Sequence, residues 1–355
     1  MKQEHDRRPA YLRLYERLRE EIVRGDYPFG TRMPSKRQLA EETELSVVTV
    51  EHAYALLTDE GYLEARQRSG HYVLFHDTDG FVPSAPARPS PGPAGERADF
   101  PFSVLSHVMR RVISEYGERL LEKSPNAGSD ALRQAISRYL ARSRGIRVKP
   151  EQIFVGSGAE YLYGLIVQLL GAQRIYAVEN PSYEKIALVY RAHGAALELL
   201  PLGADGIESP ALAAARASVL HITPYRSFPS NVTASAAKRR EYIRWAAEPG
   251  RYIVEDDVSS EFTVSSKPEE TVFSLSERDN VIYLNTFSQT VAPSLRMGYM
   301  VLSEPLAAQY GGRIGFYSCT VPFFEQLVLA ELLESGDYER HIRRTRRALR
   351  KKAEK

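Results

Sequence analysis

The segment from residue 76 to residue 99 most constrains how this chain can fold. It holds five prolines between Pro83 and Pro93, interspersed with glycine, serine and alanine. Such a composition offers too few apolar side chains to form a core, and proline-rich chains adopt extended, semi-rigid conformations. We therefore expect a linker over residues 76–99 that separates an N-terminal domain, residues 1–75, from a larger domain, residues 100–355.

Composition places both domains among ordinary soluble proteins. The 355 residues are 43% hydrophobic and 26% charged, which is typical of globular domains. The single cysteine, Cys319, excludes a disulfide within one chain and a cysteine-cluster metal site, so we expect no metal. The sequence has neither an apolar run long enough to span a membrane nor an apolar signal stretch at its N-terminus. We therefore expect a cytoplasmic protein without a membrane partner.

The N-terminal domain shows the pattern of three helices followed by a hairpin. Apolar residues recur at helical spacing over residues 11–24. Ser35 and Ser46 are expected to cap a second helix and a third helix, the latter over residues 47–60. Two helices joined by a short turn form a helix-turn-helix. Residues 61–73 resemble two short strands around a turn, which would add a wing and make a mostly α-helical winged helix-turn-helix.

This pattern predicts contacts with a double-stranded DNA operator. Helix starts favour phosphate, and the second helix of the motif enters the major groove by its N-terminal end. Three groups of residues are expected to contact phosphates and a few bases. They are Ser35, Lys36 and Arg37, then Ser46 and Thr49, and on the wing Arg66, Arg68, Ser69, Gly70 and His71. Residues 1–75 carry 12 basic and 13 acidic side chains, so a protein-binding winged helix stays an alternative.

The run from Gly30 to Val73 resembles the GntR class of bacterial regulators along its whole length. One departure concerns Val47, which directly follows Ser46 where many members of that class carry a basic or polar residue. The operator preference of the class therefore does not carry over to this chain.

The larger domain alternates helical patterns with short runs of β-branched residues. Strands separated by helices indicate an α/β domain with a mostly parallel sheet. The expected strands are residues 153–155, 175–178, 219–222, 252–254, 281–284 and 298–302.

Several phrases of this domain, among them the run from Asn285 to Gly298, resemble fold-type I aminotransferases in the version fused to GntR domains, the MocR subfamily. The resemblance implies a homodimer and a pocket for pyridoxal phosphate. It assigns Asp256 to the pyridinium nitrogen and Tyr183 to stacking on the ring. The implied phosphate contacts are Gly158, Ala159, Thr286, Ser288 and Arg296.

The sequence departs from that family on the ring side of the implied pocket. Gln289 stands where the family carries its Schiff-base lysine, and an amide has no nucleophilic amine. Val258 replaces a tyrosine, Ser227 an amide or imidazole, and Asn231 a glycine. Lys185 is the one substitute anchor considered, and relatives more often use that position for substrate. We expect no catalytic residue and, at most, non-covalent pyridoxal phosphate.

The C-terminal end gives two further expectations. The resemblance implies a small domain carrying the arginine that clamps a substrate carboxylate, whereas this sequence ends after the arginine-rich run 343–350. The larger domain is therefore expected to be C-terminally incomplete. The last fifteen residues hold eight basic residues and one glutamate, which favours a solvated helix end over a nucleic-acid contact.

The sequence thus predicts a DNA-binding transcription regulator with a degenerate, non-catalytic aminotransferase-like domain. A homodimer is expected because a winged helix that reads two half-sites gains from two-fold symmetry. A small-molecule effector is a further expected partner. Two alternatives stay open, which are a pyridoxal phosphate-dependent aminotransferase and a truncated family member without function.

Overall fold

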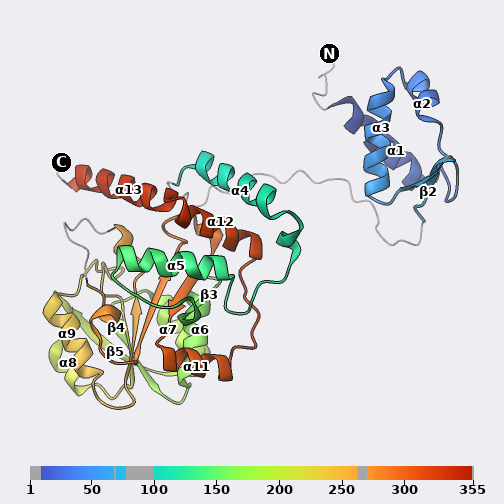
Figure 1. Ribbon diagram of the computed structural model, residues 1–355. Coiled ribbons are helices and arrows are strands. Elements are labelled where there is room, and N and C mark those ends of the chain that lie inside the picture. Colours follow the sequence, from blue (N-terminus) through green and yellow to red (C-terminus); the bar gives the residue numbers. More distant parts are fainter. Residues whose placement is uncertain (1–8, 68, 77–99, 263–269, 354–355) are drawn as a thin grey trace, which may run out of the picture. The chain divides into compact units, whose positions relative to one another are not determined.

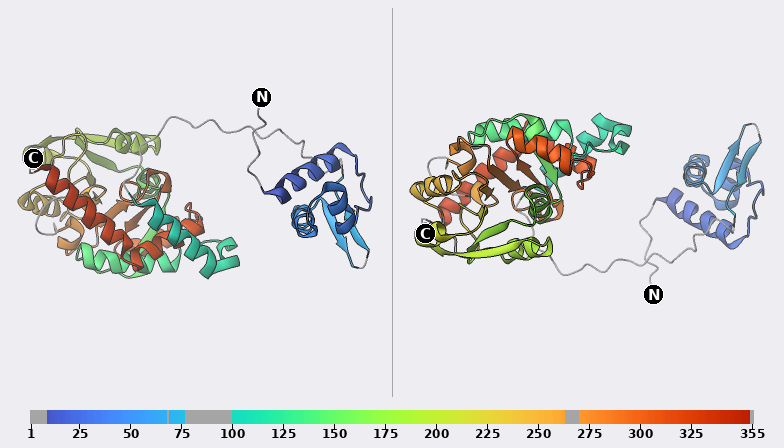
Figure 2. Two further views of the ribbon diagram at one scale, coloured as in Figure 1. Left: turned by 90° about the horizontal axis from the view of Figure 1, so that it is seen from above. Right: turned by 90° about the horizontal axis from the view of Figure 1, so that it is seen from below.

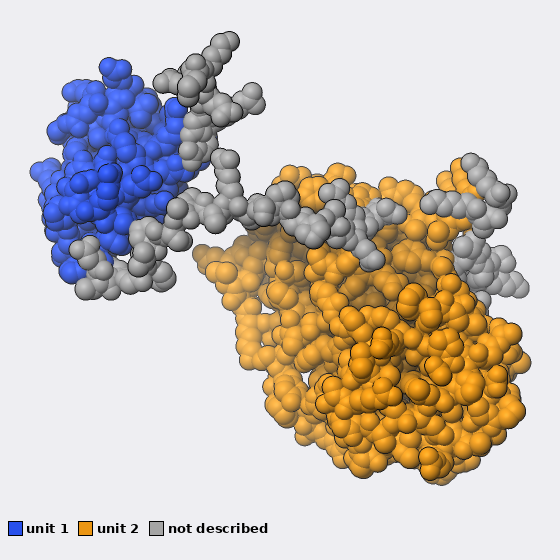
Figure 3. Space-filling view, turned by 180° about the vertical axis from the view of Figure 1, so that it is seen from behind, with its two compact units in different colours: residues 1–92 blue, residues 93–355 orange. Residues whose placement is uncertain are grey.

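The computed structural model describes residues 9–67, 69–76, 100–262 and 270–353. The chain forms two compact units, residues 1–92 and 93–355, coloured separately in Figure 3. Of the predicted linker only residue 76 is described, and Arg68 also lies outside the described residues. Each unit is treated by itself below.

The described part of the N-terminal unit contains three helices and a hairpin (Figure 1). They are α1 (Ala10–Arg24), α2 (Lys36–Thr43), α3 (Val47–Asp59), β1 (Leu63–Arg66) and β2 (Gly70–Val73). Helices α2 and α3 begin at the predicted caps, because Ser35 accepts a hydrogen bond from the Gln38 amide and Ser46 from the Thr49 amide, each at 3.1 Å. Such caps contribute about 1 kcal/mol each.

The hairpin is the predicted wing, and it is tied to the segment before α2. The antiparallel pair β1–β2 matches Leu63 with Val73 at its base and Arg66 with Gly70 at its tip. The Met33 amide donates to the His71 carbonyl at 2.9 Å, and Arg32 forms an isolated bridge with Tyr72. The wing therefore has a fixed position beside the helix-turn-helix.

The larger unit combines one sheet with surrounding helices. Its strands are β3 (Ile153–Gly156), β4 (Ile175–Asn180), β5 (Ala196–Gly203), β6 (Gly206–Ile207), β7 (Val219–Ile222), β8 (Tyr252–Asp256), β9 (Val281–Thr286) and β10 (Gly298–Val301). Its α-helices are α4 (Phe102–Tyr116), α5 (Asp130–Ser143), α6 (Ala159–Leu170), α7 (Glu184–Ala192), α8 (Ser209–Ala214), α9 (Ala236–Trp245), α10 (Val272–Leu275), α11 (Glu304–Arg313), α12 (Phe323–Glu334) and α13 (Asp337–Ala353). Short 3₁₀ turns are η1 (Gly117–Leu121), η2 (Pro150–Gln152), η3 (Ser260–Phe262) and η4 (Pro293–Leu295).

The sheet has the order β3-β10-β9-β8-β7-β4-β5-β6. Strands β10 and β6 run antiparallel to their neighbours, while the pairs from β9 through β5 are parallel. The predicted α/β domain with a mostly parallel sheet is confirmed. All six predicted strands form, and the structure adds β5 and β6, which the sequence analysis did not predict.

Helices cover both faces of the sheet, as parallel strands require (Figures 1 and 2). On one face α6, α7 and α11 pack on a core that includes Val178, Val254 and Ile282. On the other face α5 and α12 pack over β3 and β10, and α8 and α9 pack over β7. Because both faces are buried, the parallel strands end along one carboxyl edge, where open sheets of this type place their sites.

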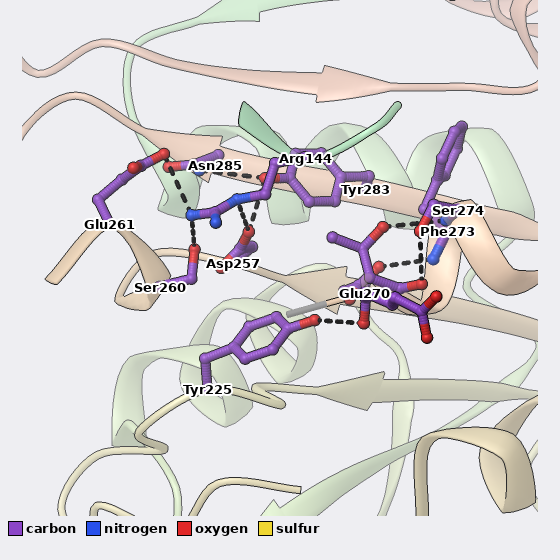
Figure 4. Close-up of polar contacts among 12 residues, drawn as sticks. Arg144, Tyr225, Asp257, Ser260, Glu261, Glu270, Phe273, Ser274, Tyr283 and Asn285 are labelled. Carbon is purple, nitrogen blue, oxygen red and sulfur yellow. Dashed lines mark hydrogen bonds and ion pairs between the residues drawn. The ribbon is translucent and has the colours of Figure 1, made fainter. Parts of the chain in front are cut away.

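A buried ion-pair network anchors α5 near this edge (Figure 4). Arg144 lies at the C-terminal end of α5, and its guanidinium is 3.2 Å from both the Asp257 and Glu261 carboxylates. Tyr283 donates to Asp257 at 2.7 Å, and the Arg346 Nε of α13 donates to the Glu261 carbonyl at 2.6 Å. Residues from four separate segments are thereby held together.

Candidate functional site

The start of α3 presents the side chains predicted to contact DNA. Ser46 is exposed, and its hydroxyl lies 2.8 Å from the Thr49 hydroxyl as well as capping the helix. Arg37 is exposed at the start of α2. The Lys36 ammonium lies 2.5 Å from the Glu51 carboxylate of α3, so this cation is already paired. Arg37 is therefore the more available of the two predicted phosphate contacts.

The wing residues make protein contacts of their own. The Arg66 guanidinium lies 4.4 Å from the centre of the Tyr72 ring and 2.9 Å from the Glu64 carboxylate. Ser69 is hydrogen-bonded to the Tyr72 hydroxyl at 2.7 Å, and Gly70 takes a φ of +109° at the tip. Burial lowers the pKa of His71, so its imidazole is uncharged at pH 7.

Sequence reasoning missed Arg32 as part of this surface. A Cβ placed on Gly70 would lie 3.4 Å from the Arg32 Nε, so the exposed guanidinium rests against the tip of the wing. Arg32 precedes the predicted helix, and only the bridge to Tyr72 brings it there. No local pattern in the sequence signals this placement.

The predicted phosphate contacts come together at the carboxyl edge of the larger unit. Gly158 caps α6 with a φ of +91°, directly before Ala159. A Cβ placed on Gly158 would lie 3.6 Å from the Arg296 Nη2. Register pairs Gly298 with Thr286 on one side and with Gly156 on the other. The Thr286 and Ser288 hydroxyls lie 3.1 Å apart, so hydroxyls, a helix start and a cation converge there.

Asp256 ends β8 and is held from one side. Its Oδ2 accepts a hydrogen bond from the Tyr163 hydroxyl of α6 and lies 3.4 Å from the His221 Nε2. The His221 Nδ1 is in turn 2.7 Å from the Tyr190 hydroxyl. Burial raises the pKa of Tyr163 well above its usual value, so the phenol stays protonated and donates. The Asp256 Oδ1 is buried and has no hydrogen-bond partner in the described structure.

Tyr183 and Lys185 lie beside the phosphate contacts, and both contact a residue that sequence reasoning missed. The Glu160 carboxylate lies 2.8 Å from the Lys185 ammonium, 2.9 Å from the Arg296 guanidinium and 3.4 Å from the Tyr183 hydroxyl. The hydrogen bond from Lys185, followed by that from Arg296, lowers the pKa of Glu160 against the opposing effect of burial.

The departures from the family lie on the same edge. Gln289 is exposed in the turn after β9, and Val258 is half-buried. Ser227 is buried, and its hydroxyl donates to the Glu179 carboxylate at 2.7 Å. Asn231 takes a φ of +57°, a conformation that explains why relatives use glycine there. The predicted anchor position therefore has no amine.

The residues present fit pyridoxal phosphate at its ring nitrogen. A buried carboxylate oxygen without a donor costs free energy, and a pyridinium N–H would supply the donor that the Asp256 Oδ1 lacks. The phosphate end offers the α6 start, two hydroxyls and Arg296. When bound, pyridoxal phosphate supplies an electron sink for reactions of amino acids.

Comparison with known proteins decides the family. Residues 10–73 match the model for bacterial regulatory proteins of the gntR family, and residues 97–355 match aminotransferase class I and II. The HTH-type transcriptional regulator YdeL of Bacillus subtilis is 31% identical over 97% of this chain and 77% of its own length. The chain belongs to this family of HTH-type transcriptional regulators.

This regulator is also similar to MocR of Rhizobium meliloti, a probable rhizopine catabolism regulatory protein, at 29% identity over 96% of this chain and 74% of that protein. Its larger unit is similar to kynurenine aminotransferase of Pyrococcus horikoshii, with a TM-score of 0.62 and 25% identity over 70% of this chain. The match covers 64% of that enzyme, so the regulator spans less than two thirds of it. The predicted resemblance to GntR and MocR regulators is confirmed.

Two searches of the described residues complete the picture of the regulator. They contain no helix both long and apolar enough to cross a membrane. In the same part of the chain no group of three or more histidine, cysteine or acidic side chains is arranged to hold a metal ion. The arginine-rich run lies on α13, where Arg343 is 3.5 Å from Glu339 and Arg346 contacts Glu261.

Proposed function

We propose that this regulator binds operator DNA as a homodimer and carries pyridoxal phosphate, or a ligand like it, without a covalent bond and without transaminating. The observation that supports it is one chain with both an exposed α3 start and Gln289 at the anchor position. DNA binding would place the regulator in the cytoplasm.

The N-terminal unit would bind through position more than through net charge. Arg37 and Arg32 lie at the approach to α2 and beside the wing, where they can reach phosphates on the two sides of a groove. Ser46 and Thr49 at the start of α3 would contact base edges. Arg66, Arg68, Ser69 and Gly70 would follow the backbone from the wing, and His71 would do so without charge.

The larger unit would bind the ligand through Asp256 at one end and Gly158, Ala159, Thr286, Ser288 and Arg296 at the other. Tyr183 is 39% exposed beside them, so its ring is free to stack on a planar ligand. Ligand bound by these contacts alone exchanges with free ligand, which suits an effector. The alternative function as an aminotransferase is supported by the fold alone.

The DNA part is tested by selecting genomic fragments and then measuring binding by fluorescence anisotropy at several salt concentrations. Arg37→Gln is expected to reduce the slope of log K against log salt by about 0.9, because one phosphate contact is lost. Arg13→Gln, an exposed arginine on α1, serves as the matched control and should leave the slope unchanged. Equal affinity for all fragments would contradict operator recognition.

The non-catalytic part is tested with purified protein, pyridoxal phosphate and a panel of amino acids with a keto-acid acceptor. No transfer of the amino group is expected, because no amine stands at position 289 to anchor the cofactor. Keto-acid formation beyond a protein-free control would favour the enzyme alternative.

A further inference from the structure

The first turn of α6 carries a carboxylate among the predicted phosphate contacts. Glu160 is the second residue of α6, two residues after Gly158, and its side chain is partly exposed. An acidic residue is favoured at a helix start because it compensates the helix dipole. A ligand phosphate would be favoured at this helix start for the same reason. The two anions would therefore seek the same place.

The cation expected to bind the phosphate is already engaged by this carboxylate. The Arg296 Nη2 lies 2.9 Å from the Glu160 Oε2, and the Lys185 Nζ lies 2.8 Å from the Glu160 Oε1. Arg296 holds a left-handed backbone conformation, with a φ of +43°, at the end of η4. Its backbone position is thus set by the turn before β10, and the guanidinium rests against Gly158.

Glu160 connects three segments through these contacts. It belongs to α6, Lys185 belongs to the first turn of α7, and Arg296 belongs to the turn between η4 and β10. The Tyr183 hydroxyl lies 3.4 Å from the same carboxylate oxygen as the lysine. A phosphate that binds Arg296 must approach or replace this carboxylate, and two anions that share one guanidinium repel each other.

We propose that Glu160 is an internal competitor for the phosphate of the ligand and determines how tightly phosphorylated ligands bind. Ligand binding and the Glu160–Arg296 ion pair then exclude each other, so a bound phosphate releases the contact between α6 and the turn before β10. This inference rests on the ligand-binding part of the proposed function, and is independent of the DNA-binding part.

The test compares pyridoxal phosphate with pyridoxal, which lacks the phosphate, in equilibrium dialysis against the full chain. Glu160→Gln is expected to tighten binding of pyridoxal phosphate by about tenfold, because a like charge is removed from the phosphate contacts. Binding of pyridoxal should change less than twofold. Glu184→Gln, an exposed acid that directly precedes Lys185, is the matched control and should change neither affinity.

A double-mutant cycle tests whether Glu160 acts through Arg296. In the Arg296→Gln background, Glu160→Gln should no longer tighten pyridoxal phosphate binding, since the shared cation is gone. Glu160→Ala is the second variant should Glu160→Gln fail to melt cooperatively, and the same tightening is expected. An equal change for both probes, or weaker binding of pyridoxal phosphate to Glu160→Gln, would overturn the inference.

Operator binding is measured on the same samples so that the two claims are separated. Glu160→Gln should bind operator as wild type does when no ligand is added. If neither protein binds pyridoxal phosphate, the ligand-binding proposal and this inference both fail, while the DNA-binding proposal is judged by the anisotropy data alone.

Discussion

Gln289 determines which chemistry the larger unit can carry out. It lies exposed after Ser288 at the carboxyl edge of the sheet, close in sequence to Arg296 and Thr286. A carboxamide has no lone-pair amine and cannot bond to an aldehyde. The surrounding contacts for a cofactor are in place, so the missing amine is what separates a binding site from an anchored one.

Replacing this one residue should therefore restore covalent attachment. In Gln289→Lys we expect borohydride treatment with pyridoxal phosphate to add one cofactor per chain, detected by mass spectrometry and mapped to residue 289. Turnover is not expected, because Val258 and Ser227 also depart from the family. Gln173→Lys, an exposed glutamine elsewhere in this unit, is the control. Equal labelling of the two variants would refute an ordered site around residue 289.

Among the elements, α3 has an unusual first turn for a helix that enters a DNA groove. Val47 and Val48 are 43% and 59% exposed, whereas Val50, Tyr54 and Leu57 of the same helix are fully buried. Exposed valines at this end cannot donate hydrogen bonds to bases. They are suited to apolar contact with the thymine methyl group, which projects into the major groove.

This leads to a prediction about thymines in the operator. Replacing contacted thymines by uracil, which lacks the methyl, should weaken binding about fourfold per methyl, from a burial term of about 0.8 kcal/mol. In Val47→Ala/Val48→Ala the uracil operator should bind as well as the thymine operator. Leu74→Ala, exposed after the wing, should behave as wild type. A double variant that still discriminates would contradict the contact.

Helix α5 depends on the Arg144 network of Figure 4. The Arg144 side chain is 4% exposed, as are its partners Asp257 and Glu261 at 0% and 2%. Burial raises the pKa of Asp257 to about 6 even against the opposing effect of Arg144. Removing the cation would therefore leave two buried carboxylates without a counter-charge.

We expect Arg144→Met to lower the free energy of unfolding by about 3–5 kcal/mol at pH 7, because breaking one side of a buried ion pair has that cost. Arg142→Met on the same helix removes a surface pair with Glu339, and its expected cost is below about 1 kcal/mol. Denaturant unfolding followed by circular dichroism measures both. Equal losses in the two variants would show that the buried network does not stabilise the unit.

At the scale of the whole larger unit, buried carboxylates should make stability depend on pH. Burial raises the pKa of Glu179 to about 7 and that of Glu255 to about 8. The unfolded chain releases these protons near pH 4.5, whereas the folded state retains them to higher pH. Their contribution to folding is therefore complete below pH 4.5 and is lost as the pH rises through 7 and 8.

Glu179→Gln should remove part of this dependence. At pH 8 the variant is expected to gain about 2–3 kcal/mol over wild type, since a pKa difference of one unit corresponds to about 1.4 kcal/mol. At pH 4.5 the gain should vanish. Exposed Glu208→Gln is the control. Unfolding titrations at both pH values measure it, and a gain that is independent of pH would rule out the titration of Glu179 as its cause.

Local signals predicted the elements well and the long-range contacts poorly. Ser35 and Ser46 were predictable as caps because a cap bonds an amide three residues away. Strand β5 was not predicted, because its residues lack strict alternation and its pairing with β4 decides its conformation. Arg32 and Glu160 were missed because their partners are Gly70 on the wing and Arg296, 136 residues away.

The sequence by itself determined two folded units, a winged helix-turn-helix before an aminotransferase-like body, and the absence of an amine at residue 289. These depend on composition, local hydrogen bonds and residue identity, which are written along the chain. Only the tertiary structure decided that Arg296 is paired with Glu160, that the Asp256 Oδ1 is left without a donor, and that His71 is uncharged. Those properties depend on burial and on charges brought together from distant segments, which no local pattern specifies.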